Sequence, residues 1–462
     1  GRGGDRMQVT PNKDVEAMVR ASLVSLALIL LHPQAHAETT WRGTSDVSKV
    51  SGSGDVLTPG GSRLTLSSDQ EGKEAFFGSI ASLDAAPYRG QDVVLSGILE
   101  VEEGAGTAAL WIRADEARQP VAFDSTRHTP VNLQHRAQSR EVRLYVPRTA
   151  THLRLGVTMT GVGRIKAASL RLQAEVPAHS DVSAYDVLDA AISQIETKAL
   201  NRSRVDWKAE RARLLTEDLK DLPAQEAHPR IRIALSSLAD RHSGHLTRSG
   251  MEALRTSANP SQPVQASVSD NVGYLRMPGL SGTDPEATRQ FSASVCRRLE
   301  DMASEAVHGV IVDLRVNSGG NMWPMVSGLL PLLGEGNIGA FRDADGKVSP
   351  WKARAVGGCT ADMATTPVAV LISRSTASSG EAVATAFRGR PGTRFFGQPT
   401  AGLATGNARV PLPDGSALML TQSNFLDRTG QLVPDRLTPD VLVEKGQDPL
   451  ALARSWLVPA PE

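Results

Sequence analysis

The chain has 462 residues, which is long enough for about two or three domains of ordinary size. Fifty Lys and Arg residues balance fifty Asp and Glu residues, and a formal net charge of zero argues against a general nucleic-acid binder, which needs surplus positive charge. Hydrophobic residues make up 40% of the chain and exclude wholesale disorder. The two cysteines are too few for a disulfide scaffold or a four-cysteine zinc site. These counts leave a soluble multi-domain protein, either an enzyme or a binding protein.

The N-terminal region carries a pattern typical of a secretory signal. Arg20 precedes an apolar run over residues 21–31, and small residues follow at Ala35 and Ala37. The run is shorter than the roughly 20 residues that a membrane-spanning helix needs; a buried helix of the folded protein is the alternative. We therefore expect residues 1–37 to be upstream sequence and signal peptide. The mature chain is then extracytoplasmic, either periplasmic or secreted, with no stable membrane span.

Residues 38–176 are rich in Gly, Ser, Thr and Val and contain short runs of alternating polarity, which are typical of half-buried strands. Turn residues separate several of the runs, and this favours an antiparallel β-sandwich. Part of the region, from Tyr88 through Trp111 to Pro147, resembles jelly-roll modules related to carbohydrate-binding domains. That resemblance implies a glycan contact, whereas the low aromatic content of 4% favours a structural or positioning role. The runs cover residues 93–99, 108–113, 142–146 and 153–157.

The next segment is helical by its apolar spacing. Apolar residues recur every three or four positions between 185 and 199, which predicts an amphipathic helix with Ser180 or Asp181 as its N-cap. We expect residues 180–250 to form a helical cap segment. Two further helices are predicted over residues 207–219 and 229–238.

Residues 265–460 alternate between strand and helix patterns, which indicates an α/β core. The nearly continuous apolar runs at 310–314 and 368–372 are typical of buried parallel strands. A further strand is predicted at 272–276, and helices at 283–303 and 379–387.

The two cysteines, Cys296 and Cys359, fall within this core region. An oxidising compartment permits a disulfide between them, but the sequence is equally compatible with two separate buried thiols.

Ser378 stands between a predicted buried strand and a predicted helix. A serine there meets the free N–H groups of a helix N-terminus, and the amide of Ser379 could donate to an oxyanion. The alternative is that Ser378 and Glu381 form a capping box. The surrounding residues are not a Gly-x-Ser-x-Gly elbow, so the ordinary α/β-hydrolase interpretation gains no support.

A second signal is the pair Gly319 and Gly320, which follows the strand at 310–314. Glycines allow a close approach of the backbone to a ligand, and their N–H groups could complete an oxyanion hole. The alternative is a tight strand-to-helix turn. A catalytic serine also needs a base, and spacing alone does not choose between His242 and His245.

Three ordered segments, at 313–320, 376–381 and 396–402, resemble the tail-specific, or C-terminal-processing, serine peptidases. This family includes the tricorn core proteases and the nisin-resistance proteins, and the resemblance extends from about residue 180 to 455. The resemblance implies that Ser378 is the nucleophile. It also implies oxyanion donors at Ser379 and at Gly319 or Gly320.

Two departures indicate the branch. The processing peptidases use a Ser-Lys dyad, but Leu403 stands 25 residues after Ser378, where their lysine is expected. The nisin-resistance and tricorn-like branch uses histidine, and His242, 136 residues before Ser378, matches that position, whereas His245 does not. Too few residues separate the helical segment from the strand at 272–276 to hold a PDZ domain.

We therefore predict an exported serine peptidase with a Ser378–His242 dyad that needs no metal or organic cofactor. Glu381 would orient the site or bind a substrate amine, or only cap the helix. The expected partners are peptide or protein substrates, with no nucleic acid. The alternatives are a catalytically weak glycan- or protein-binding protein on a peptidase fold, and an envelope esterase.

Overall fold

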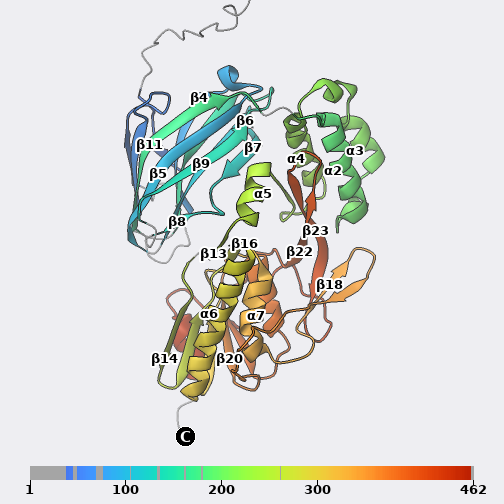
Figure 1. Ribbon diagram of the computed structural model, residues 1–462. Coiled ribbons are helices and arrows are strands. Elements are labelled where there is room, and N and C mark those ends of the chain that lie inside the picture. Colours follow the sequence, from blue (N-terminus) through green and yellow to red (C-terminus); the bar gives the residue numbers. More distant parts are fainter. Residues whose placement is uncertain are drawn as a thin grey trace, which may run out of the picture. The chain divides into compact units, whose positions relative to one another are not determined.

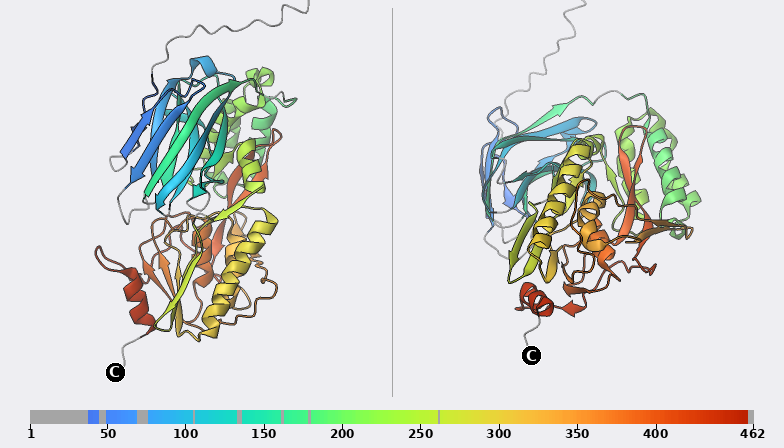
Figure 2. Two further views of the ribbon diagram at one scale, coloured as in Figure 1. Left: turned by 60° about the vertical axis from the view of Figure 1, so that its left-hand side comes forward. Right: turned by 60° about the horizontal axis from the view of Figure 1, so that its bottom comes forward.

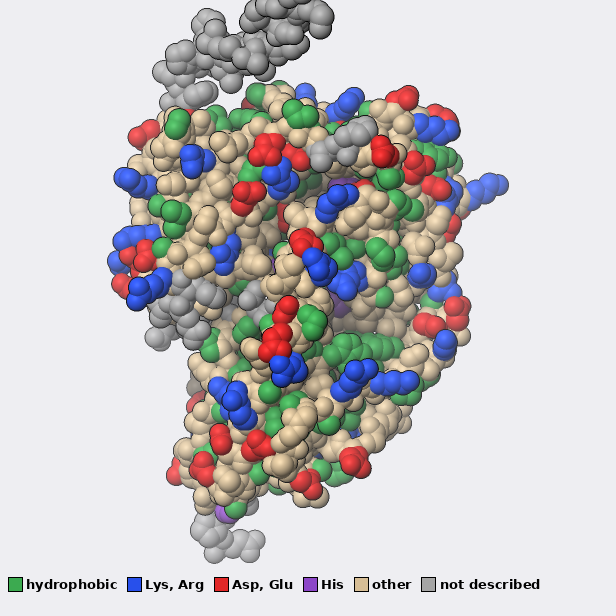
Figure 3. Space-filling model, viewed as in Figure 1, with side chains coloured by type: hydrophobic (Ala, Val, Ile, Leu, Met, Phe, Trp, Pro, Cys, Tyr) green, Lys and Arg blue, Asp and Glu red, His purple; other side chains and the backbone are tan. Residues whose placement is uncertain are grey.

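The structure, a computed structural model, describes residues 38–44, 49–68, 76–104, 106–132, 136–160, 163–177, 180–260 and 262–458 (Figure 1). The predicted signal peptide over residues 1–37 lies outside the described residues. Within these described ranges, no helix has both the length and the apolar character needed to cross a membrane. Acidic and basic side chains are interspersed on the face drawn in Figure 3, in keeping with the formal net charge of zero.

Two antiparallel sheets form the N-terminal half, drawn in blue to teal in Figures 1 and 2. One has the strand order β1-β4-β10-β6-β7, with β8 on β6, and the other has the order β2-β3-β11-β5-β9. Apolar side chains from both sheets, such as Leu110 and Leu95, share one core. The prediction of antiparallel sheets is thus confirmed, and the four predicted runs fall on β5, β6, β9 and β10.

The strands of the first sheet are β1 (Arg42–Gly43), β4 (Phe76–Asp84), β6 (Thr107–Glu116), β7 (Gln119–Ser125), β8 (Val131–Asn132) and β10 (His152–Thr160). Those of the second are β2 (Lys49–Ser53), β3 (Ser62–Ser68), β5 (Asp92–Gly104), β9 (Gln138–Tyr145) and β11 (Gly163–Glu175).

Helices α2 (Ala184–Lys198), α3 (Trp207–Leu214) and α4 (Ala227–Ser236) follow. The predicted N-cap of the first helix was wrong: Ser183, not Ser180 or Asp181, caps α2 through a capping box with Asp186.

The second predicted helix ends early, at Leu214, and a short 3-10 turn (Glu217–Asp221) replaces its last part. Arg230 of α4 explains this ending, because its guanidinium donates to the Leu214 carbonyl and to the Thr216 hydroxyl, both at 2.6 Å. A side chain from another helix therefore terminates α3.

A six-stranded sheet, in the order β14-β15-β17-β20-β21-β24, lies at the centre of the C-terminal half. It is parallel from β15 onward. Helices α6, α7 and α8 cover one face and α9 the other, and Figure 2 shows α6 (yellow) and α9 (red) on opposite sides of the sheet. Both faces are therefore covered, and β17 and β20 are buried throughout. The strands are β14 (Gln265–Ser269), β15 (Val272–Arg276), β17 (Gly309–Asp313), β20 (Val368–Ile372), β21 (Thr393–Gly397) and β24 (Val441–Leu442), and the helices are α6 (Pro285–Ser304), α7 (Met322–Leu333), α8 (Ser379–Phe387) and α9 (Pro449–Leu457).

A second, antiparallel sheet joins the helical segment to this core. Its long strand β23 pairs with β12, β18 and β22, and α2 and α4 pack against β22 and β23 in one apolar cluster. The sheet therefore brings the chain that follows α4 toward the parallel sheet. Its strands are β12 (Gly244–Leu246), β18 (Ala340–Asp343), β19 (Val348–Pro350), β22 (Thr405–Pro411) and β23 (Ala417–Leu426); α5 (Arg248–Arg255), β13 (Ala258–Pro260) and β16 (Leu280–Gly282) lie nearby.

The two cysteines are joined. Cys296 of α6 and Cys359, in the segment before β20, form a disulfide with a Cα–Cα distance of 6.0 Å. Of the two possibilities that the sequence left open, the structure has the disulfide.

Candidate active site

The site is assembled where two neighbouring parallel strands, β17 and β20, end. The paired glycines follow β17 and Ser378 follows β20, so strand pairing brings the two loops together. The loops are also bonded directly, because the N–H of Ala377 donates to the Asn317 carbonyl at 3.0 Å. A Cβ on Gly380 would lie 2.3 Å from that same carbonyl oxygen, so this contact requires glycine. The carboxyl ends of parallel strands are the usual place for a site in such sheets.

Ser378 occupies a strained backbone conformation, with φ +52° and ψ −116°, directly before α8. A non-glycine residue in such a conformation costs on the order of 1–3 kcal/mol and persists only where its surroundings fix it. Here the Ser378 N–H donates to Oε2 of Glu381 at 2.9 Å. Ser378 therefore lies outside the regular helix, at the N-terminus whose dipole favours negative charge.

His242 reaches the serine. Its Nε2 lies 2.8 Å from Oγ of Ser378, and its Nδ1 lies 2.8 Å from Oγ1 of Thr405. When Nδ1–H donates to the threonine hydroxyl, Nε2 is left as an acceptor for the serine proton. Burial lowers the pKa of His242 to about 4, although the negative charge of Asp240 opposes this shift. The imidazole is therefore neutral, and able to take a proton, at neutral pH.

Several contacts fix the backbone of His242. Oδ1 of Asp240 accepts the N–H groups of His242 and Ser243 at 3.0 and 2.6 Å, which closes a turn. The Asn407 side chain donates to the His242 carbonyl at 2.8 Å. Two residues later β12 begins and pairs with β23, so the histidine is anchored on both sides.

Of the two candidate histidines, His245 does not take part in this contact. Its ring lies 4.4 Å from the ring of His228, and both line a different cavity. Of the two, His242 is therefore the histidine within hydrogen-bonding distance of Ser378.

Glu381 is fully buried, and its carboxylate accepts four hydrogen bonds. The donors, at 2.5–3.1 Å, are the Thr400 hydroxyl and the N–H groups of Ser378, Gly402 and Leu403. Burial raises the pKa of Glu381, and these hydrogen bonds oppose the shift. The carboxylate therefore ties the serine loop to the loop at 400–403, which suits a supporting role better than contact with a substrate amine.

The paired glycines lie against the serine. Both have positive φ, +105° at Gly319 and +114° at Gly320, and a Cβ on Gly319 would be 2.9 Å from Cβ of Ser378. The Gly319 N–H donates to Oδ1 of Asn317 at 3.0 Å. Since that donor is engaged, the N–H groups of Gly320 and Ser379 are the better-placed candidates for an oxyanion hole. The Ser379 hydroxyl adds a 2.6 Å bond to the Gly320 carbonyl.

A cavity of about 660 Å³ adjoins the dyad on the histidine side. His242, Leu403 and Thr405 line it, together with charged side chains that include Arg241 and Arg342. Such a polar, open cavity could hold part of an extended substrate.

Sequence reasoning missed Thr405 and Asn407. Neither residue lies beside a motif that marks a histidine partner. Thr405 stands two residues after Leu403, at the start of β22. Among the described residues, the side chains spaced to hold a metal ion are Cys296, Glu300 and Cys359. Both of these cysteines are joined in the disulfide, so the group does not suit a metal.

Residues 271–443 match peptidase family S41. The nisin-resistance protein of Lactococcus lactis subsp. lactis is 33% identical over 189 residues, which are 38% of this chain and 58% of that protein. The chloroplastic carboxyl-terminal-processing peptidase 2 of Arabidopsis thaliana is 26% identical over 198 residues, 40% of this chain and 36% of the peptidase. The chain thus spans less than two thirds of the length of these relatives.

A solved structure of a lipoprotein from Streptococcus agalactiae has the same fold over 61% of this chain and 98% of its own, with a TM-score of 0.53 and 24% identity. Residues 271–443 are thus similar to the serine-type peptidases of family S41.

Proposed function

We propose that the protein hydrolyses peptide bonds through a dyad of Ser378 and His242. The observation that carries the proposal is the 2.8 Å contact between Nε2 of His242 and Oγ of Ser378, made by residues 136 positions apart. A neutral imidazole aimed at a strained serine on a helix N-terminus is the arrangement that nucleophilic catalysis requires.

In the first half of the reaction, Nε2 of His242 takes the hydroxyl proton while Oγ of Ser378 attacks the scissile carbonyl carbon. The imidazolium then gives its proton to the leaving amine, and an acyl-enzyme remains. In the second half a water molecule repeats the steps and releases the acid. The Thr405 hydroxyl accepts the Nδ1–H throughout, so it holds the ring and stabilises its charged form.

The negative charge that develops on the carbonyl oxygen needs donors. The N–H groups of Ser379 and Gly320 would supply them, because the Gly319 N–H is bound to Asn317. The dipole of α8 adds a favourable field at the same point.

The proposed domains follow one another along the chain. Residues 38–176 would form a jelly-roll-like β-sandwich with a positioning role, residues 180–250 a helical cap, and residues 265–460 the peptidase core, with no PDZ domain between cap and core. The disulfide supports a location outside the cytoplasm, after removal of the leader over residues 1–37.

The test is peptide-library hydrolysis by the wild-type protein beside Ser378→Ala and His242→Ala. We expect both variants to lose at least about a thousandfold in kcat/KM, while His152→Ala, which removes an exposed histidine of β10, keeps wild-type activity. Wild-type hydrolysis by Ser378→Ala would refute the assignment.

A fluorophosphonate label mapped by mass spectrometry separates the alternatives. A labelled Ser378 with cleavage of esters but not peptides would indicate an esterase. Neither labelling nor hydrolysis would indicate a binding protein on a peptidase fold.

A further inference from the structure

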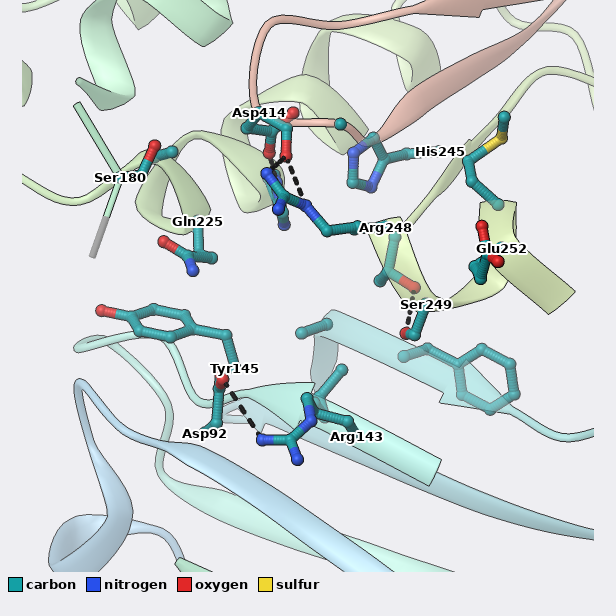
Figure 4. Close-up of a pocket in the computed structure, with 18 of the residues that line it drawn as sticks. Asp92, Arg143, Tyr145, Ser180, Gln225, His245, Arg248, Ser249, Glu252 and Asp414 are labelled. Atoms are coloured by element: carbon teal, nitrogen blue, oxygen red, sulfur yellow. Dashed lines mark hydrogen bonds and ion pairs between the residues drawn. The ribbon is translucent and has the colours of Figure 1, made fainter. Parts of the chain in front are cut away.

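A second cavity, of about 540 Å³, lies apart from Ser378, between strands of the β-sandwich and the segment that runs from α4 to α5 (Figure 4). Figure 4 shows Tyr145 and Arg143 on the sandwich side, and Gln225, Arg248 and His245 on the opposite side, facing the same space. The volume is in the range of small-molecule sites.

Polar atoms of this lining lack partners. Among the described residues, both ring nitrogens of His245, Oε1 of Gln225 and Nε of Arg232 are buried without a hydrogen bond. Buried polar groups are nearly always satisfied, because leaving them unpaired is costly. Unpaired groups that converge on one cavity therefore indicate a polar ligand.

The charges of the lining identify the sign of that ligand. Arg255 is paired with Glu252, and Arg143 with Asp92 and Glu175. His228 holds the Asp414 carboxylate at 2.6 Å, so that anion is engaged as well.

Two cations remain. Arg248 donates through Nε to the Asp414 carbonyl at 2.9 Å, and Arg232 donates to the Phe123 carbonyl at 3.3 Å. Within the part of the chain that the structure describes, neither arginine has an ion pair with a carboxylate. Asp124 acts on Arg232 only at longer range, and Oδ2 of Asp124 accepts the Thr247 and Ser249 hydroxyls. The polar part of the cavity thus favours an anion.

Much of the remaining wall is apolar. Phe123, Leu144, Tyr145, Pro147 and Met251 line it, mainly from the sandwich side. A ligand that fills the cavity therefore needs an apolar body beside its charged group.

We propose that this cavity binds a small amphipathic carboxylate, with its carboxylate among Arg232, Arg248 and His245 and its apolar body against the sandwich strands. Arginine donors suit a carboxylate, which accepts two parallel N–H groups. The same chemistry occurs in a free acid and at the C-terminal residue of a short peptide. The site goes beyond the proposed peptidase activity, and its occupancy can be measured without a substrate.

The experiment is calorimetric titration of the full chain with octanoate and with N-acetyl-phenylalanine, each beside its neutral amide. We expect saturable binding of at least one carboxylate, about tenfold or more tighter than its amide. Octanoate alone would indicate a free acid, and N-acetyl-phenylalanine alone a peptide end. Absence of saturable binding by both would overturn the proposal.

Variants locate the binding. Arg232→Gln should weaken it about tenfold, whereas Arg230→Gln, on the same helix but bonded to Leu214 and Thr216, should not. His245→Phe keeps the ring and removes both nitrogens, so it should also weaken binding. Unchanged affinity in Arg232→Gln and His245→Phe would overturn the site.

Photo-crosslinking of the wild-type protein tests the location without variants, which can fail to fold. A diazirine-bearing alkanoate should crosslink to residues of the lining, such as Tyr145 or Met251, and excess octanoate should suppress the crosslink. Crosslinks only elsewhere would refute the location.

Discussion

Replacing Thr405 by valine tests whether the histidine acts as the base. Valine has nearly the shape of threonine but no hydroxyl, so Nδ1–H of His242 loses the acceptor that lies 2.8 Å away. The substitution leaves the contact between Nε2 and Ser378 in place. The variant therefore loses only the hydrogen bond that supports the proposed base, and it keeps both His242 and Ser378.

The size of the effect follows from the charge that develops on the ring. A hydrogen bond to a charged group contributes about 1.5–3 kcal/mol, and about 1.4 kcal/mol corresponds to a factor of ten in rate. Loss of the threonine hydroxyl should thus slow the chemical step roughly 10- to 150-fold. KM should change little, because the hydroxyl is bonded to the histidine.

The assay is the second-order rate of fluorophosphonate labelling of Ser378, which needs no natural substrate, followed by kcat/KM on a cleaved peptide. Thr405→Ser keeps the hydroxyl and serves as the matched control. A wild-type labelling rate in Thr405→Val would show that Nδ1 needs no acceptor there, and the proposed role of Thr405 would be wrong.

Protonated His242 cannot act as a base, so labelling should fall as the pH drops through about 4, the pKa of this ring; a midpoint near 6.5 would contradict its burial. Cys296→Ser with Cys359→Ser should lower the free energy of unfolding by about 4 kcal/mol in the chain-entropy relation for this separation of 63 residues, and an unchanged denaturation midpoint would refute that estimate. Gly380→Ala should reduce labelling, because its Cβ would press on the Asn317 carbonyl; full labelling would show that the loop adapts.

The local parts of the fold could be predicted from the sequence because local chemistry decides them. The strands at 272–276 and 368–372 and the helix at 379–387 have the predicted bounds. A short run rich in β-branched apolar residues, such as that at 368–372, is typical of a buried strand. The placement of Ser378 between strand and helix followed from the same pattern.

The partners of the serine could not be found in this way. Thr405 bonds a ring 163 residues away, and Asn407 a carbonyl 165 residues away. Such contacts depend on the pairing of β12 with β23, and a three-residue strand gives no periodic signal. The N-cap of α2 was similarly ambiguous, because Ser180 and Ser183 both place a serine side chain near the start of the helix. Only the reciprocal hydrogen bonds with Asp186 select Ser183.

In the proposed mechanism the base comes from a distant part of the chain, because Leu403 stands where a Ser-Lys dyad would have its lysine. The N–H of Leu403 is bonded to Glu381, and Glu381 also holds the Ser378 N–H, so this loop is already fixed beside the nucleophile. A base on this loop would need no other anchor, but a leucine side chain cannot accept a proton. Two residues on, Thr405 instead bonds the ring of His242, the proposed base, which lies just before the paired strand β12. Peptidase activity should therefore depend on the stability of the pairing between β12 and β23. A Ser-Lys dyad, with its lysine on the loop, would not depend on that pairing.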